Sequence, residues 1–106
     1  MNINDLAKVQ LGQNGSIYHA GTDTLTCGVT GLNFLAITFV TDTNFAASNG
    51  LVSVDNTRFP NTETAATAID TDGDVVDAAV FPAGMTIYGK WSQIILDSGS
   101  IIAYIG

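Results

Sequence analysis

Short apolar runs separated by glycine and Asn-Gly steps are the feature of this sequence that most limits its fold. Within the runs, apolar residues alternate with small or polar ones, and in 24–30 Leu25, Cys27 and Val29 occupy every second position. A period of two places such side chains on one face of a β-strand, with Cys27 pointing inward. Long helical periodicity is absent. The pattern predicts an all-β, hairpin-rich fold, either a compact antiparallel sandwich (jelly-roll-like) or a small barrel, with roughly seven to nine strands.

Two Asn-Gly pairs predict hairpins, because both residues of a two-residue type I′ turn need a positive φ. In each case the residues that would face one another give one apolar side. The pairs are Asn14-Gly15 and Asn49-Gly50, and the expected hairpins join 7–13 to 16–20 and 44–48 to 51–54.

The segment 34–40 is apolar at nearly every position, which indicates a central strand buried on both faces. By contrast, 55–64 is polar, contains Pro60 and predicts a loop, and a short helix over 62–68 is a possible continuation. We expect 34–40 to lie deepest in the core.

The C-terminal part has the densest strand pattern. Gly89 interrupts it, which predicts a bulge or a bend at a corner of the sheet. After the turn at 97–99, the strand 100–105 has no polar face: Ile102 and Tyr104 alternate with three other apolar residues. This strand should therefore lie in the middle of a sheet or be covered by a neighbouring subunit, and we expect 91–96 and 100–105 to form a C-terminal hairpin.

Composition limits the class of function. The 106 residues fit one β domain, 1–106. A net charge of −7 disfavours binding to nucleic acid or to anionic membranes. Only 12% of residues are charged, which suits burial against other proteins. No export signal, apolar segment of membrane-spanning length or possible internal disulfide is seen, so synthesis in a cytoplasm is expected.

Catalytic chemistry finds little support in the sequence. His19 is the single histidine and Cys27 the single cysteine, and a nucleophilic pair would need them close together. Cys27 is expected to be a buried thiol and His19 a solvated or structural side chain. No phosphate-binding loop, zinc-type spacing or Gly-x-Ser-x-Gly motif is present. We expect a protein that is not an enzyme.

One acidic segment, 70–77, begins like a calcium-binding loop but departs from it, since Gly73 and Val75 do not fit the EF-hand positions. An irregular Ca²⁺ site is the weaker interpretation, and a turn at Asp72-Gly73 with solvated carboxylates is the stronger. No other cofactor is expected. The candidate Ca²⁺ ligands are Asp70, Asp72, Asp74 and Asp77.

Aromatic and arginine side chains are the candidates for an interface, because both are enriched at binding hot spots. Aromatic residues near the C-terminus could instead form a carbohydrate platform or simply pack in the core. The predicted interface residues are Arg58 and Phe59 in the polar loop, and Tyr88, Trp91, Ile102 and Tyr104 in the C-terminal strands.

The segments 81–91 (FPAGMTIYGKW) and 98–106 (SGSIIAYIG) resemble small virion structural proteins of marine bacteriophages, including cyanophages. Upstream of Asp70 only a general Thr-, Asn- and Gly-rich style is similar. The resemblance implies a capsid decoration or cement protein, made in the host cytoplasm and located on the capsid surface of the virion. It further implies binding to the major capsid protein and to copies of itself, often as a homotrimer. The alternative is a tail, fibre or receptor-binding component that contacts host glycans.

Overall fold

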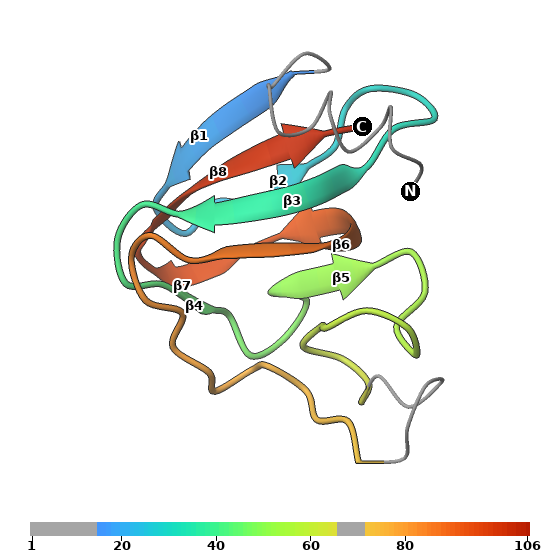
Figure 1. The fold of residues 1–106 in the computed structure, drawn as a ribbon, viewed down its shortest axis with the longest axis vertical. Helices are drawn as coiled ribbons and strands as arrows, with labels where there is room; N and C mark the ends of the chain where they lie inside the picture. Colours follow the sequence, from blue (N-terminus) through green and yellow to red (C-terminus); the bar gives the residue numbers. More distant parts are fainter. Residues whose placement is uncertain (1–14, 66–71) are drawn as a thin grey trace.

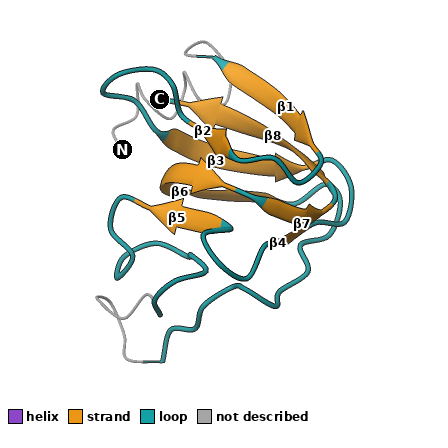
Figure 2. Ribbon diagram, turned by 180° about the vertical axis from the view of Figure 1, so that it is seen from behind, coloured by secondary structure: helices purple, strands orange, loops and turns teal. Residues whose placement is uncertain are grey.

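The structure is a computed structural model that describes residues 15–65 and 72–106 (Figure 1). These residues form an all-β fold in which an antiparallel sheet nearly closes into a small barrel. Neither described segment contains a helix, as Figure 2 also shows. The strands are β1 (Ser16–Ala20), β2 (Leu25–Thr26), β3 (Phe34–Phe39), β4 (Asn44–Phe45), β5 (Leu51–Ser53), β6 (Thr86–Ile94), β7 (Leu96–Ser98) and β8 (Ser100–Ile105).

The main sheet has the order β1-β8-β3-β6-β2, and β5 also pairs with β6, while β4 and β7 form a separate two-stranded sheet. Strand β3 is therefore flanked by β8 on one edge and β6 on the other. The predicted C-terminal hairpin is wrong, because β3 separates its two arms. The expectation that 100–105 lies in the middle of a sheet is confirmed, since β8 pairs with both β1 and β3.

The core lies inside the nearly closed sheet. Strand β3 is buried along almost its whole length, which confirms the prediction for 34–40, although Val40 itself is exposed. Three phenylalanine rings close one part of the core: Phe39 stacks on Phe81 with a centroid distance of 4.7 Å, and Phe45 meets both edge-on. The buried core cluster is Phe34, Ile37, Phe39, Phe45, Leu51, Trp91, Ile94, Leu96, Ile101 and Ala103.

The predicted irregularity at Gly89 is confirmed as a bulge. Ala36 pairs with Tyr88 but Phe34 pairs with Trp91, so β6 uses one residue more than β3 over this stretch. A Cβ atom at Gly89 would lie 2.6 Å from the Trp91 ring, which explains why only glycine fits here. The bulge brings Gly89 against the indole ring in the core.

The predicted hairpin at Asn49-Gly50 is wrong, although Asn49 has the positive φ of a turn residue (58°). Instead β4 pairs with β7 and β5 pairs with β6. The Ala46 N–H donates to the Ile95 carbonyl at 2.9 Å, and the Ile95 N–H donates to the Gly50 carbonyl at 2.8 Å. The chain thus turns around Ile95, and this long-range pairing replaces the local one.

Other predicted elements differ in extent. The strand expected over 24–30 is reduced to β2, and Cys27 is half-buried against the core. Residues 62–65 are not helical, and the rest of the possible helix lies outside the described residues. The first arm of the hairpin at Asn14-Gly15 also lies outside them; its second arm, β1, pairs with β8.

Candidate functional site

One face of the main sheet turns away from the core and carries three tyrosines. We call it the tyrosine face. Cross-strand neighbours of an antiparallel sheet point to the same side, and positions two residues apart along a strand share that side. Two parallel rows of side chains therefore cross β1, β8, β3 and β6. The first row is Ser16, Tyr104, Ala36 and Tyr88, and the second is Tyr18, Ile102, Thr38 and Thr86.

Three of the predicted interface residues, Tyr88, Ile102 and Tyr104, are brought together on this face. Tyr88 is 50% exposed, while Tyr104 is half-buried because it packs over Leu35 and Ala36. Tyr18, which the sequence analysis did not select, is the most exposed of the three tyrosines at 63%. The tyrosine face is thus an apolar and aromatic surface that remains partly open to solvent.

Trp91 does not belong to this surface. It lies on the same strand as Tyr88, but the bulge at Gly89 leaves its ring fully buried in the core. Its indole N–H donates to the Pro60 carbonyl at 2.7 Å. Trp91 therefore packs the core and anchors a loop, and its side chain is not exposed on the surface that carries Tyr88.

The main sheet holds none of the acidic side chains of the described chain. Seven of those residues lie in loops or turns and the eighth, Asp97, lies in β7. The basic side chains of the main sheet are Lys90 in β6 and His19 in β1. Burying a carboxylate at an interface without a partner is costly, so a carboxylate-free sheet suits protein contact. The tyrosine face is therefore an uncharged surface on an acidic protein.

A second surface is the 55–64 loop, which follows β5 and extends below the sheet in Figure 1. Its centre is Asn61, a fully buried polar side chain. The Asn61 amide N–H groups donate to the carbonyls of Asn56 (2.7 Å) and Phe59 (2.8 Å). The amide oxygen accepts from the backbone N–H groups of Glu63 (2.8 Å) and Thr64 (2.7 Å). All four hydrogen-bonding positions of the side chain are thus satisfied.

Backbone contacts tie this loop to its surroundings. The Val76 N–H donates to the Asn61 carbonyl at 2.9 Å, and Leu51 and Thr62 exchange hydrogen bonds through their backbone and side-chain atoms. Together with the bond from Trp91 to Pro60, these contacts hold the loop at three consecutive residues, Pro60, Asn61 and Thr62. The 55–64 loop is therefore a fixed surface feature.

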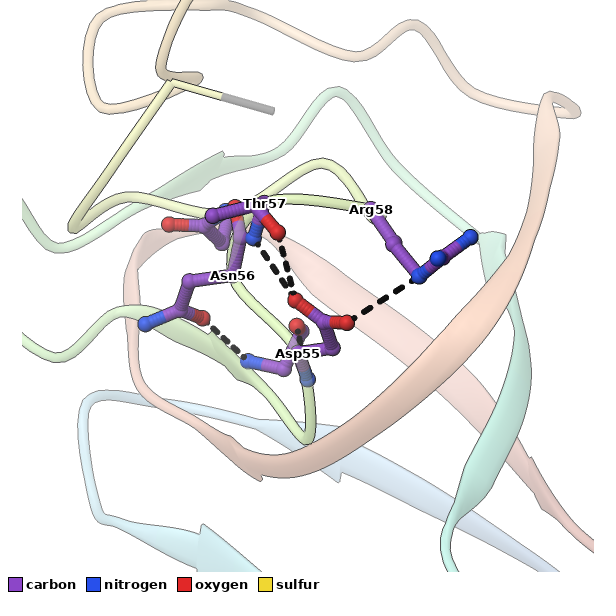
Figure 3. Close-up of polar contacts among 6 residues, drawn as sticks. Asp55, Asn56, Thr57 and Arg58 are labelled. Carbon is purple, nitrogen blue, oxygen red and sulfur yellow. Dashed lines mark hydrogen bonds and ion pairs between the residues drawn. The ribbon is translucent and has the colours of Figure 1, made fainter. Parts of the chain in front are cut away.

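The loop presents Arg58 beside Asp55 (Figure 3). The Asp55 carboxylate accepts from the Thr57 hydroxyl (2.8 Å) and the Thr57 N–H (3.1 Å), and its other oxygen lies 3.2 Å from the Arg58 Nε. The Thr57 hydroxyl, then its backbone N–H and the Arg58 charge, lower the pKa of Asp55 below its usual value. The Arg58 side chain remains 64% exposed, and Phe59 is half-buried.

The catalytic and metal candidates occupy separate environments. The His19 ring lies with Nε2 3.0 Å from the Asp23 carbonyl, and Cys27 packs on the core. Within 15–65 and 72–106, no group of three or more His, Cys, Asp or Glu side chains is placed to hold a metal ion. Asp72, Asp74 and Asp77 are exposed in a segment without strands, and Asp70 lies outside the described residues.

Two contributors were missed by the sequence analysis for different reasons. Tyr18 lies in 16–20, which the sequence pairs with a local hairpin arm, and its place beside β8 depends on a strand at the other end of the chain. Asn61 sits in a polar loop, where nothing in the sequence distinguishes a buried amide from a solvated one. The sequence offers only the neighbouring Pro60 as a sign of fixed geometry.

Comparison with known proteins found no relative. No protein-family model matches the chain, and no curated protein or solved structure matches it either. In the described residues, no helix is long and apolar enough to cross a membrane.

Proposed function

We propose that this protein is a bacteriophage virion structural protein, a capsid decoration or cement protein that binds the major capsid protein and stabilises the shell. It is made in the host cytoplasm, joins the outer surface of the capsid and catalyses no reaction. The resemblance of 81–91 and 98–106 to small phage virion proteins supports the choice of partner. The observation that supports a binding role is that the exposed 55–64 loop is fixed by hydrogen bonds and presents Arg58 beside Phe59.

A rigid exposed loop is well suited to binding, because little conformational entropy remains to be lost when a partner docks. The Asn61 network fixes the backbone, and Asp55 holds the Arg58 guanidinium by its Nε edge. Arginine and aromatic side chains dominate binding hot spots, and the loop offers Arg58 next to Phe59. In this proposal the loop contacts the capsid protein.

The side chains that could act in catalysis already have structural partners, which also supports a role without catalysis. Asp55 is engaged by Thr57 and Arg58, and Cys27 is packed against apolar side chains. A nucleophile requires an adjacent base within hydrogen-bond reach, and no such hydrogen bond links Cys27 to another side chain in the described residues. The carboxylates of 72–77 are spread along an exposed segment.

The test is reconstitution on shells. Capsids that lack this chain are incubated with the purified protein, and bound protein is quantified by mass spectrometry. Arg58→Ala should weaken binding by about tenfold or more if Arg58 is a hot spot. Lys90→Ala is the matched control, since it removes the other exposed cation of the described chain and should change binding less than about threefold. Absence of the chain from purified particles, or equal losses for both variants, would contradict the proposal.

The alternative function is a tail, fibre or receptor-binding component that contacts host glycans. The observation in its favour is the alignment of Tyr18, Tyr88 and Tyr104 on one sheet face, because sugars stack on exposed aromatic rings. Copy number separates the two functions: a decoration protein is present in hundreds of copies per particle and a fibre in far fewer. A glycan array in which binding is lost on Tyr88→Ala would favour the receptor-binding function.

A further inference from the structure

The guanidinium of Arg58 is held at one edge and open at the other. Its Nε lies 3.2 Å from the Asp55 carboxylate, and Figure 3 shows the two terminal nitrogens pointing away from Asp55. The N–H groups on these terminal nitrogens form a planar fork that matches two acceptor oxygens at once. Within 15–65 and 72–106, no other side chain forms an ion pair or a hydrogen bond with the guanidinium. The open edge is therefore a bidentate donor that has no acceptor among the described residues.

The turn that carries Arg58 is fixed by short-range hydrogen bonds. The Arg58 backbone N–H donates to the Asp55 carbonyl at 3.1 Å. The Asp55 N–H donates to the Ser53 hydroxyl at 2.9 Å, and the Ser53 N–H donates to the Asn56 amide oxygen at 3.1 Å. The carboxylate that orients the guanidinium is itself held by the hydroxyl and the N–H of Thr57. Both the backbone of Arg58 and its counter-ion are thus in place before a partner binds, so little conformational entropy is lost on docking.

The ion pair between Arg58 and Asp55 adds little to the stability of the fold. The two side chains are 64% and 40% exposed, and ion pairs at such exposed sites are screened by water and salt. Binding to a partner gives the same guanidinium a larger effect, because the partner removes water from around the charge. Phe59, a half-buried apolar residue, follows Arg58 in the chain and limits the access of water to a contact made beside it. The arrangement is therefore better explained by binding than by stability.

The charge of the protein selects the kind of acceptor. Carboxylate and phosphate groups both match the arginine fork. A phosphate carries about 1.5 to 2 negative charges at neutral pH, so a protein of net charge −7 repels it more strongly than a singly charged carboxylate. We infer that the open edge of Arg58 binds an Asp or Glu carboxylate of the partner protein through two parallel N–H···O hydrogen bonds. This inference rests on the proposed function, and it names the group of the capsid protein that the 55–64 loop meets.

Arg58→Lys separates the fork from the charge. Lysine keeps the positive charge but cannot form two parallel hydrogen bonds with one carboxylate. In the shell-binding assay, Arg58→Lys should therefore weaken binding about fivefold or more, most of the loss expected for Arg58→Ala. Lys90→Arg makes the reverse exchange at another exposed cation and is the matched control, which should bind like the wild type. An Arg58→Lys variant that binds within about twofold of the wild type overturns the inference, because the partner then responds to charge alone.

Blocking the carboxylates of the shell tests the acceptor. Treatment with a carbodiimide and glycinamide converts exposed carboxylates to neutral amides, and electron microscopy checks that the shells stay intact. The wild type should bind blocked shells about tenfold more weakly, whereas Arg58→Ala, which has no fork to lose, should lose less than about threefold. Equal losses for the two proteins, or no loss for the wild type, overturn the carboxylate as the partner of Arg58. A wild type that does not bind unmodified shells contradicts the proposed function itself, so the two failures are distinguishable.

Discussion

Replacement of Asn61 tests whether the 55–64 loop is held by its buried amide. Asn61→Ala removes four hydrogen bonds, two donated to loop carbonyls and two accepted from backbone N–H groups. A typical hydrogen bond contributes about 0.5–1.5 kcal/mol, and partners left unsatisfied cost more. Glu63 and Thr64 are exposed residues whose N–H groups regain some hydration. The expected loss is therefore about 2–4 kcal/mol of the free energy of unfolding.

Asn61→Asp adds a test with a pH dependence. One carboxyl oxygen would face two carbonyl oxygens in a fully buried site, which disfavours the anion more than the two N–H donors on the other oxygen favour it. The folded-state pKa of the new carboxyl is then raised above its unfolded value of about 3.9. The variant should be close to the wild type below about pH 4 and lose stability as the pH rises through the folded-state pKa.

Urea unfolding at pH 7 and about pH 3.5 measures both effects, with fluorescence of the single tryptophan as the signal. Trp91 is fully buried and bonded to the loop, so it reports on the region concerned. Asn44→Ala is the control, because Asn44 bonds to Asp97 and Ser98 at an exposed site, where water can replace both partners, and the loss should be less than about 1 kcal/mol. Equal losses for Asn61→Ala and Asn44→Ala, or a deficit of Asn61→Asp that does not change with pH, would refute the reasoning.

Three further substitutions have defined outcomes. Trp91→Phe keeps a ring in the core but removes the 2.7 Å bond to Pro60. Urea unfolding, followed by circular dichroism because the variant has no tryptophan, should show a loss of about 1–3 kcal/mol. Gly99→Ala should cost about 2 kcal/mol or more of the free energy of unfolding in urea, because φ is +103° and the new Cβ would lie 2.6 Å from a backbone carbonyl oxygen. Gly28→Ala is the control, and it should be nearly neutral because there is open space around Gly28. Asp55 has a lowered pKa in the folded state, so its carboxylate stabilises the protein above the unfolded pKa and loses this effect as the pH falls through the folded value. The difference in stability between the wild type and Asp55→Asn should therefore shrink from pH 7 to about pH 2, measured in acid titrations followed by fluorescence.

The strands themselves were largely predictable from the sequence because their signals are local. The apolar run of β3 indicates burial on both faces, and the glycine within β6 indicates a bulge; both are found. Alternation in β8 separates Ile102 and Tyr104 from the core-facing Ile101 and Ala103, as the structure has it. Period and turn chemistry carry this information within a few residues.

Strand partners and the two surfaces were less predictable, because they depend on distant contacts. Asn49-Gly50 forms a turn, yet hydrogen bonds to Ile95 decide where the flanking segments go. Trp91 and Tyr88 looked equivalent as interface candidates until the bulge placed one inside and the other outside. The importance of Asn61 follows from five backbone groups that meet it only in the folded loop.

The position of β3 between β6 and β8 governs how the chain can fold. Both strands that complete its hydrogen bonding come from the last part of the described chain, where Phe34 pairs with Trp91 and with Ile105. Such distant pairing costs loop-closure entropy before any contact is gained, and it slows folding. During synthesis, β3 emerges with two apolar faces and no neighbour until 86–105 have followed. The nascent protein thus depends on its final strands to cover its most aggregation-prone segment.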